Sequence, residues 1–320
     1  MQVPVLSASS IAKVFRVSGK PVIALRGVSI APLAGETFGI VGESGSGKST
    51  LGRIAVGLET PSGGALYIEG ERVDALPASL RREKFRRCQM IFQDPYSSLN
   101  PRLSIGKQIG EAIYARGVSD WREIRSDVGE LLEKVGLRRE LADRYPHEFS
   151  GGERQRIAIA RALAPSPGVV VADEPVSALD VSIQAQILDL MEAVRRENSL
   201  CYILISHDMS VIARLCDRVA VMHQGRIVEL GPTPSVIEKP QHPYTRNLLD
   251  AVPRFGRRRS DQKSIPEVLP LHDDHDNMVE ISNGHFVLES LAKLTKPAVV
   301  LGGARTQRAC PGRKLVKDGG

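Results

Sequence analysis

Residues 42–50 combine the side-chain types and the spacing that bind a phosphate group. They fit the pattern G-x-x-x-x-G-K-[ST] in full. Three glycines let the backbone curl until successive N–H groups point at an anion, so that Lys48 reaches the β- and γ-phosphates of a nucleotide and the Ser49 hydroxyl ligates Mg²⁺. The pattern is filled by Gly42, Glu43, Ser44, Gly45, Ser46, Gly47, Lys48, Ser49 and Thr50.

This phosphate loop, residues 42–50, has the flanking elements that such a loop needs. Residues 37–41 are rich in apolar side chains and predict a buried strand, and residues 51–56 can begin a helix. The start of a helix adds free N–H groups and the positive end of its dipole. A glycine-rich turn could match the pattern by chance, but this context favours phosphate binding.

Polar side chains stand at the ends of three further apolar runs, namely Gln93, Asp173 with Glu174, and His207. Open α/β sheets place their ligands beyond the carboxyl ends of the strands. Asp173 would hold Mg²⁺ there, as the strand-end Asp of phosphate-loop enzymes does, which leaves Glu174 free to act on water. Taken singly, Asp173 and Glu174 could instead belong to a charged loop, and His207 could be a structural histidine.

A second possible anion site is the turn Ser150-Gly151-Gly152, which precedes a helical run over residues 157–163. Ser150 is a plausible N-cap, and its hydroxyl together with the free N–H groups of the helix start could hold an anion. Capping alone also explains these residues, so the turn by itself leaves the two interpretations open.

Residues 94–165 change character and predict a block of helices with a small core of its own. Apolar residues recur there every three or four positions, a spacing typical of core-facing stripes, at Ile105, Ile109, Ile113, Trp121, Ile124, Val128, Leu131, Leu132 and Val135. Outside the block, short strands are predicted at 3–8, 11–17 and 24–30, and a hairpin at 218–222 and 226–230.

The chain has 320 residues, 42% of them hydrophobic, which is enough for a full core and a second small domain. Its net charge of +6 fits a nucleotide, an anionic lipid surface or nucleic acid without choosing between them. The four scattered cysteines form no C-x-x-C pair and suit a reducing cytosol. We find no signal-peptide core and no run near the ~18–20 apolar residues of a membrane span, so we expect any membrane role to come through a partner.

Taken in order, these motifs resemble an ATP-binding cassette, the motor subunit of ABC transporters. The resemblance covers roughly residues 3–255 and has five ordered parts: the phosphate loop, Gln93, residues 150–155, residues 169–180 and His207. A Ser-Gly-Gly turn directly before a helix and ahead of the Asp-Glu strand is the signature of this family.

Longer stretches are similar to the oligopeptide/dipeptide importer branch of the family. They are residues 92–102, 144–152 and 174–186, with His242-Pro243-Tyr244-Thr245-Arg246 resembling the C-terminal mark of that branch. Without the resemblance, the last of these reads as a loop followed by a helix that packs on the core.

The resemblance implies an α/β fold, a P-loop NTPase cassette with a RecA-like core sheet, an N-terminal antiparallel β subdomain and an inserted α-helical subdomain. We expect the cassette to span 3–255, with its core at 3–93 and 166–232 and the helical subdomain at 94–165. Residues 256–320 would be a C-terminal extension that is partly ordered.

Roles for single residues follow from the same resemblance. Glu174 would be the catalytic base, His207 a switch that senses the γ-phosphate, and Gln93 a contact to Mg²⁺ or the attacking water. Phe15, for which spacing alone favours a core or edge aromatic, would stack on adenine. Asp180 would bridge two subunits, and ATP held by the opposite subunit would meet Ser150, Gly151, Gly152 and Glu153.

The expected function is an Mg²⁺-dependent ATPase that drives uptake of peptides or a related small solute. Its partners would be a second cassette, of the same or a related chain, two transmembrane permease subunits and, indirectly, an extracytoplasmic solute-binding protein. It would lie on the cytoplasmic face of the inner membrane and bind no nucleic acid. The alternatives are a soluble cassette acting on nucleic acid or ribosomes, and a nucleotide kinase or GTPase, which the Ser-Gly-Gly turn disfavours.

The sequence also departs from the family pattern. Glu153 stands where the family often has Gln. Many members of the branch carry a cysteine cluster near the C-terminal mark, of which only Cys310-Pro311 remains, so an iron–sulfur cluster is not supported. The run His272-Asp273-Asp274-His275-Asp276 could bind a metal, although a solvated loop is the favoured interpretation.

Overall fold

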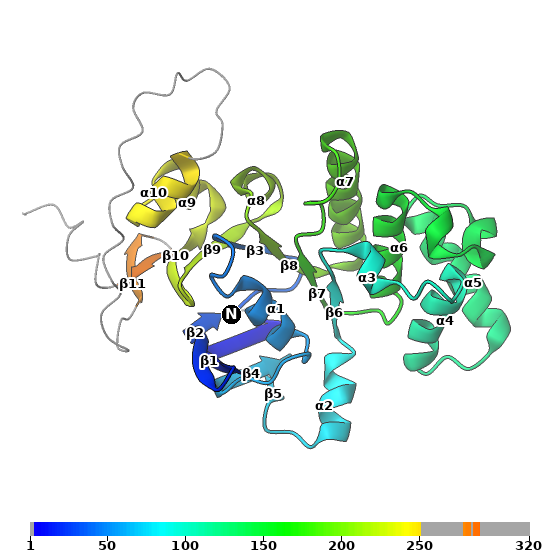
Figure 1. Cartoon of the computed structure of the whole chain (residues 1–320), viewed down its shortest axis with the longest axis horizontal. Coiled ribbons are helices and arrows are strands. Elements are labelled where there is room, and N and C mark those ends of the chain that lie inside the picture. Colours follow the sequence, from blue (N-terminus) through cyan, green and yellow to red (C-terminus); the bar gives the residue numbers. More distant parts are fainter. Residues whose placement is uncertain (1–2, 251–277, 283, 289–320) are drawn as a thin grey trace, which may run out of the picture.

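The computed structural model describes residues 3–250, 278–282 and 284–288, which form two β-sheets and their covering helices (Figure 1). The larger sheet has eight strands in the order β11-β12-β10-β9-β3-β8-β7-β6. They are β3 (Thr37–Val41), β6 (Cys88–Ile91), β7 (Val169–Asp173), β8 (Cys201–Ser206), β9 (Arg218–His223), β10 (Arg226–Pro232), β11 (Met278–Ser282) and β12 (His285–Leu288).

The five strands from β6 to β9 are parallel, and they are apolar on both faces, as expected of a sheet covered by helices on each side. Every residue of β3, β7 and β8 is buried. Their register aligns the strand ends, because Val41 pairs with Ser206 and Asp173 with Ile205. The segments that follow these strands therefore meet at one border of the sheet, here called the carboxyl edge.

The smaller sheet is antiparallel, with the strand order β2-β1-β4-β5. Its strands are β1 (Leu6–Val17), β2 (Lys20–Ile30), β4 (Gly63–Ile68) and β5 (Glu71–Arg72). The prediction of separate strands at 3–8 and 11–17 is wrong, since β1 runs through both. An irregularity in its register between Ala8 and Ile11, where Ser10 has a φ of 49°, accounts for the interrupted apolar pattern.

Helices α3 to α6 gather beside β6, at the opposite end of the larger sheet from β11 (Figure 1). The helices are α1 (Lys48–Ala55), α2 (Ala78–Phe85), α3 (Pro95–Ser98), α4 (Ile105–Ala115), α5 (Trp121–Lys134), α6 (Gly151–Leu163), α7 (Val181–Asn198), α8 (Met209–Leu215), α9 (Thr233–Glu238) and α10 (Pro243–Asp250), with 3₁₀ turns η1 (Arg139–Asp143) and η2 (Pro146–Glu148).

Most residues of the apolar stripes of α4 and α5 are buried as predicted and Leu131 is partly buried, with two further differences. They belong to one continuous cluster with strand residues such as Val170 and Leu204, so the helical block has no separate core. Trp121 is 63% exposed. A helical side chain lies over the preceding turn, and Trp121 is the first residue of α5, so its own helix offers no turn to cover the ring.

Candidate functional site

The phosphate loop connects β3 to α1 at the carboxyl edge, and two of its glycines are required by close contacts. A Cβ atom on Gly42 would lie 2.2 Å from the carbonyl oxygen of Met222 in β9. Gly47 has a φ of 103°, and a Cβ there would lie 2.6 Å from the carbonyl oxygen of Ala24. The loop thus runs directly against the backbone of two strands, which only glycine permits.

Lys48 begins α1 and is buried within the loop. Its Nζ donates to the carbonyl oxygens of Gly42 and Glu43, each at 2.7 Å. Burial lowers the pKa of the Lys48 ammonium, and the nearby carboxylates of Glu174 and Asp173 oppose that shift. A cationic donor is therefore held beside two acids at the centre of the loop.

Ser49 and Asp173 form a buried oxygen pair. The Ser49 hydroxyl donates to Asp173 Oδ1 at 3.1 Å, and Asp173 is 6% exposed. Burial raises the pKa of this carboxyl group; the Ser49 hydrogen bond lowers it, and the charge of Glu174 raises it further. A hydroxyl and a buried carboxylate are oxygen donors of the kind that Mg²⁺ selects.

Two polar side chains from separate strand ends, Gln93 and His207, converge on Glu174. Gln93 Nε2 donates to Glu174 Oε2 at 3.0 Å, and His207 Nδ1 lies 3.1 Å from Glu174 Oε1. The structure thus brings together the residues that follow β6, β7 and β8. Gln93 and His207 remain exposed while the Glu174 carboxylate is mostly covered, so the cluster faces out of the carboxyl edge.

Ser150 caps α6, as predicted, through a reciprocal pair of hydrogen bonds with Glu153. The Glu153 N–H donates to Ser150 Oγ, and Glu153 Oε2 accepts from the Ser150 N–H at 2.9 Å and from its hydroxyl at 2.8 Å. These bonds, the backbone one first, lower the pKa of Glu153. Gly151 and Gly152 form the first turn of α6, and the hydrogen bonds between the Glu153 carboxylate and Ser150 beside them were not predicted from the sequence.

Phe15 and Asp180 lie outside the cluster around Glu174. Phe15 is half-buried on β1, with Lys13 Nζ 4.8 Å from the centroid of its ring. Asp180 caps α7 and accepts hydrogen bonds from the Ile183 N–H at 3.0 Å and the Ser182 hydroxyl at 2.7 Å. Both side chains therefore have local partners, and the roles that the resemblance assigns to them stay predictions.

One contact at the phosphate loop was missed by sequence reasoning. The Glu43 N–H donates to Tyr244 Oη at 2.8 Å, across 201 positions of the chain. In the sequence, Tyr244 stands out only as part of the C-terminal mark that resembles the importer branch. That mark is the sequence feature that singles out Tyr244, but the local pattern does not predict which distant element the Tyr244 hydroxyl contacts.

The remaining sequence candidates lie elsewhere. The run 272–276 and Cys310 fall outside the described residues. Within the described residues, no group of three or more His, Cys, Asp or Glu side chains could hold a metal ion. The same residues include no helix with the length and apolar content needed to span a bilayer.

Comparisons with known proteins agree with this geometry. Residues 25–177 match the family described as ABC transporter, and residues 228–277 match the oligopeptide/dipeptide transporter C-terminal region. The oligopeptide transport ATP-binding protein OppF of Bacillus subtilis is 47% identical over 261 residues, which cover 79% of this chain and 86% of that protein. The glutathione import ATP-binding protein GsiA of Escherichia coli is 47% identical over 279 residues, but the chain spans only 45% of that longer protein.

Solved structures show the same fold. The dimeric ATP-binding cassette MJ0796, in a post-hydrolysis state bound to ADP and Pi, superposes with a TM-score of 0.65 at 28% identity and covers 71% of this chain and 98% of its own. The protein cbiO1 from Clostridium perfringens, part of the ABC transporter complex cbiONQ, gives 0.67 at 26% identity, with 77% and 96% covered.

The fold, the phosphate loop and these relatives define an ATP-binding subunit of an ABC transporter. Within that class, the chain belongs to the oligopeptide/dipeptide importer family. It is accordingly an ATPase, as the sequence predicted.

Proposed function

We propose that the chain hydrolyses Mg-ATP to drive uptake of peptides or a related small solute. The observation that carries this proposal is the convergence of Gln93 and His207 on Glu174 next to the phosphate loop. The solute class is inferred from the oligopeptide and glutathione importers that the chain is similar to.

Magnesium would be held by Ser49 and Asp173, with Gln93 as a further contact. The fit rests on the 3.1 Å hydroxyl–carboxylate pair and on the raised pKa of Asp173, since a nearby cation would stabilise the ionised form of a buried acid. When bound, the ion would neutralise charge on the phosphate oxygens. Lys48 would turn from the loop carbonyls to the β- and γ-phosphates, because an ammonium group binds phosphate oxygens strongly.

Glu174 would accept the proton of the attacking water. One of its carboxylate oxygens is bound by Gln93 and the other by His207, so the carboxylate is held in one orientation while each oxygen keeps a lone pair that can accept the proton. His207 would stabilise the γ-phosphate and report its loss, and Gln93 would orient the water. Phe15 would stack on adenine, which is worth ~1–3 kcal/mol for a base face.

The second half of each site would come from another cassette. The Ser-Gly-Gly turn begins α6 in the helical block, and across the described residues no hydrogen bond joins it to the phosphate loop. In a head-to-tail pair, Ser150, Gly151, Gly152 and Glu153 would face ATP on the opposite subunit, and Asp180 would lie at the junction. The dimeric relative supports this arrangement.

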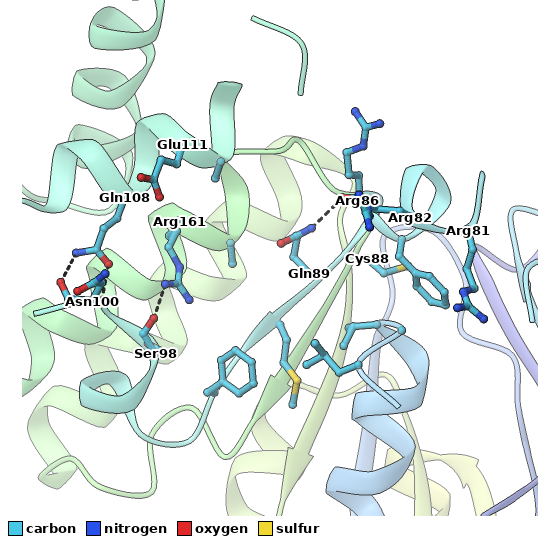
Figure 2. A pocket seen from close by; sticks show the side chains of 18 of the residues that line it. Arg81, Arg82, Arg86, Cys88, Gln89, Ser98, Asn100, Gln108, Glu111 and Arg161 are labelled. Carbon is cyan, nitrogen blue, oxygen red and sulfur yellow. Dashed lines mark hydrogen bonds between the residues drawn. The ribbon is translucent and has the colours of Figure 1, made fainter. Parts of the chain in front are cut away.

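A cavity of about 790 Å³ beside β6 is the proposed contact with a permease subunit. Figure 2 shows Arg81, Arg82 and Arg86 on its α2 side, and Gln108 and Glu111 on its α4 side. We infer that the occupant is a cytoplasmic segment of the permease that presents carboxylates to the three arginines.

The cavity borders the strand end that carries Gln93. Phe92 lines it and is followed by Gln93, whose amide holds Glu174. Movement of a docked segment would therefore be transmitted to the base. The assembly would include two permeases on the cytoplasmic face of the inner membrane, and an extracytoplasmic solute-binding protein would act through them.

The substitution Glu174→Gln tests the catalytic assignment. It removes the base but keeps a side chain of the same size, so ATP binding should persist and the dimer should be trapped while hydrolysis falls by at least ~100-fold. Fluorescent-ATP binding, light scattering and phosphate release measure the three effects. Glu197→Gln, on the exposed face of α7, is the control. Normal turnover by Glu174→Gln would refute the assignment.

The transport assignment is tested by the partner that co-purifies. Purification from membranes should retain hydrophobic permease subunits. DNA or RNA binding with a steep salt dependence, in their place, would favour the alternative of a cassette acting on nucleic acid or ribosomes.

A further inference from the structure

The turn that carries Tyr244 is built around a fully buried carboxylate. Glu229, on β10, accepts hydrogen bonds from the N–H groups of Gln241 at 2.9 Å and His242 at 3.0 Å. His285 Nε2, from β12, lies 2.7 Å from the same carboxylate. Because a buried carboxylate without partners is very costly, Glu229 fixes the turn 241–244 in one place.

Tyr244 extends from this turn to the phosphate loop. Its own N–H donates to His242 Nδ1 at 3.0 Å, and its ring lies 4.1 Å from the ring of His223, centroid to centroid. Its hydroxyl accepts from the Glu43 N–H. Burial raises the pKa of Tyr244 to about 12, so the hydroxyl stays neutral at physiological pH.

The part of the loop around Ser46 has a separate support. The Gly225 N–H, in the turn between β9 and β10, donates to the carbonyl oxygen of Ser46 at 3.0 Å. Tyr244 thus supports the N-terminal part of the loop, at Glu43, and it comes from outside the strands that flank the loop. In Figure 1, α10 and α9 lie next to β9 and β10, at the end of the sheet that carries β11.

We propose that Tyr244 is a positioning residue for nucleotide binding, which holds the N-terminal part of the phosphate loop in the conformation that accepts ATP. Glu229 acts through Tyr244, because it fixes the turn that carries this residue. The C-terminal turn would then set the affinity of the loop for nucleotide. The inference rests on ATP binding by residues 42–50 and adds a residue that would act through the loop backbone.

The substitution Tyr244→Phe removes only the hydroxyl and keeps the ring on His223. We expect the Kd and KM for Mg-ATP to rise about three- to tenfold, the effect of one lost hydrogen bond, with kcat and melting temperature near those of the unmodified protein. Tyr114→Phe, at a tyrosine that is 64% exposed, is the matched control and should change none of these values.

A double-variant cycle tests whether Glu229 acts through Tyr244. Glu229→Gln should weaken ATP binding in the natural chain but add nothing in the Tyr244→Phe background, whereas independent effects would add. Wild-type affinity in Tyr244→Phe, or a fall in melting temperature alone, would overturn the inference. Lys48→Ala separates the two proposals: if the unmodified chain binds ATP no better than this variant, the proposed function fails as well.

Discussion

Glu174 has a φ of 47°, a left-handed backbone conformation that costs a residue with a Cβ about 1 kcal/mol or more. Two hydrogen bonds hold it there: its N–H donates to the Ile205 carbonyl oxygen at 2.9 Å, and its own carbonyl oxygen accepts from the Ser177 hydroxyl at 3.1 Å. These bonds therefore fix the backbone from which the carboxylate extends. Such a conformation at a strand end supports a functional role for the residue.

At the residue scale, Asp173→Asn should stabilise the nucleotide-free protein. Burial raises the pKa of Asp173 above its ordinary 3.8, so the unfolded chain loses this proton at lower pH than the folded chain does. The native residue therefore loses stability as pH rises through 3.8 and up to the folded-state pKa, and the variant does not. At neutral pH we expect a melting temperature about 2–4 °C higher.

The same variant should lose the Mg²⁺-dependent part of its stabilisation by ATP. Thermal melts with and without Mg-ATP, repeated at acid pH where the difference should vanish, measure both effects. Asp189→Asn, on the exposed face of α7, is the control. Equal melting curves for Asp173→Asn and the natural chain at neutral pH would contradict the argument.

Glu153 carries a second residue-scale prediction. Its carboxylate occupies the N–H and hydroxyl of Ser150, donors that a γ-phosphate would also need. Glu153→Gln removes the competing charge, so ATP-driven dimerisation in the Glu174→Gln background should strengthen about three- to tenfold. Light scattering against ATP concentration measures it. Glu148→Gln, which alters a similar cap on Tyr145, should have no such effect, and weaker dimerisation by Glu153→Gln would count against competition.

At the scale of elements, α1 is placed by the glycine that lets it approach the sheet. A Cβ on Gly52 would lie 2.7 Å from Ile205 Cδ1 and 3.0 Å from Val171 Cγ1, both buried in strands β8 and β7. The first turn of the same helix carries Lys48 and Ser49. The positions of Lys48 and Ser49 therefore depend on a packing contact one turn further along the helix.

The substitution Gly52→Val should both destabilise the fold and weaken ATP binding. Overpacking of this kind costs about 1–3 kcal/mol, and the helix can relieve it only by moving away from the sheet. Urea unfolding and nucleotide titration measure the two losses. Gly63→Val is the matched control, because a Cβ there meets only Ala12 Cβ at 3.7 Å. Similar results for the two variants would show that α1 is not placed by this contact.

The sequence predicted the convergence at the carboxyl edge because parallel strands end together, so polar residues after separate apolar runs must meet. It also predicted the cap at Ser150, which depends on local spacing alone. The contact of Tyr244 with Glu43 could not be predicted from the sequence, because the two residues are brought together only by the packing of α10 on the sheet. The exposure of Trp121 was also not predicted. Trp121 fits the helical period of the apolar residues, but it is the first residue of α5, so no preceding turn of that helix covers its ring.

At the scale of the whole molecule, the phosphate loop and the Ser-Gly-Gly turn lie in different parts of the chain, and the proposed head-to-tail pair predicts rescue between inactive variants. Lys48→Ala should abolish the phosphate-loop half of a site, and Ser150→Arg the other half. In a mixed pair, one site would combine two intact halves, so mixing two inactive proteins should restore part of the natural ATPase rate. The natural chain alone sets the reference rate. No recovery, with an active natural chain, would mean that each subunit contains a complete site.

The strands β11 and β12 determine where a shortened form of the protein can end. They come from residues 278–288, yet β12 pairs with β10 and places His285 against Glu229 inside the larger sheet. A stop codon after residue 250 would retain every nucleotide-binding motif but expose the edge of β10 and deprive its buried acid of an imidazole. Truncations meant to yield a well-behaved catalytic fragment should therefore end after residue 288.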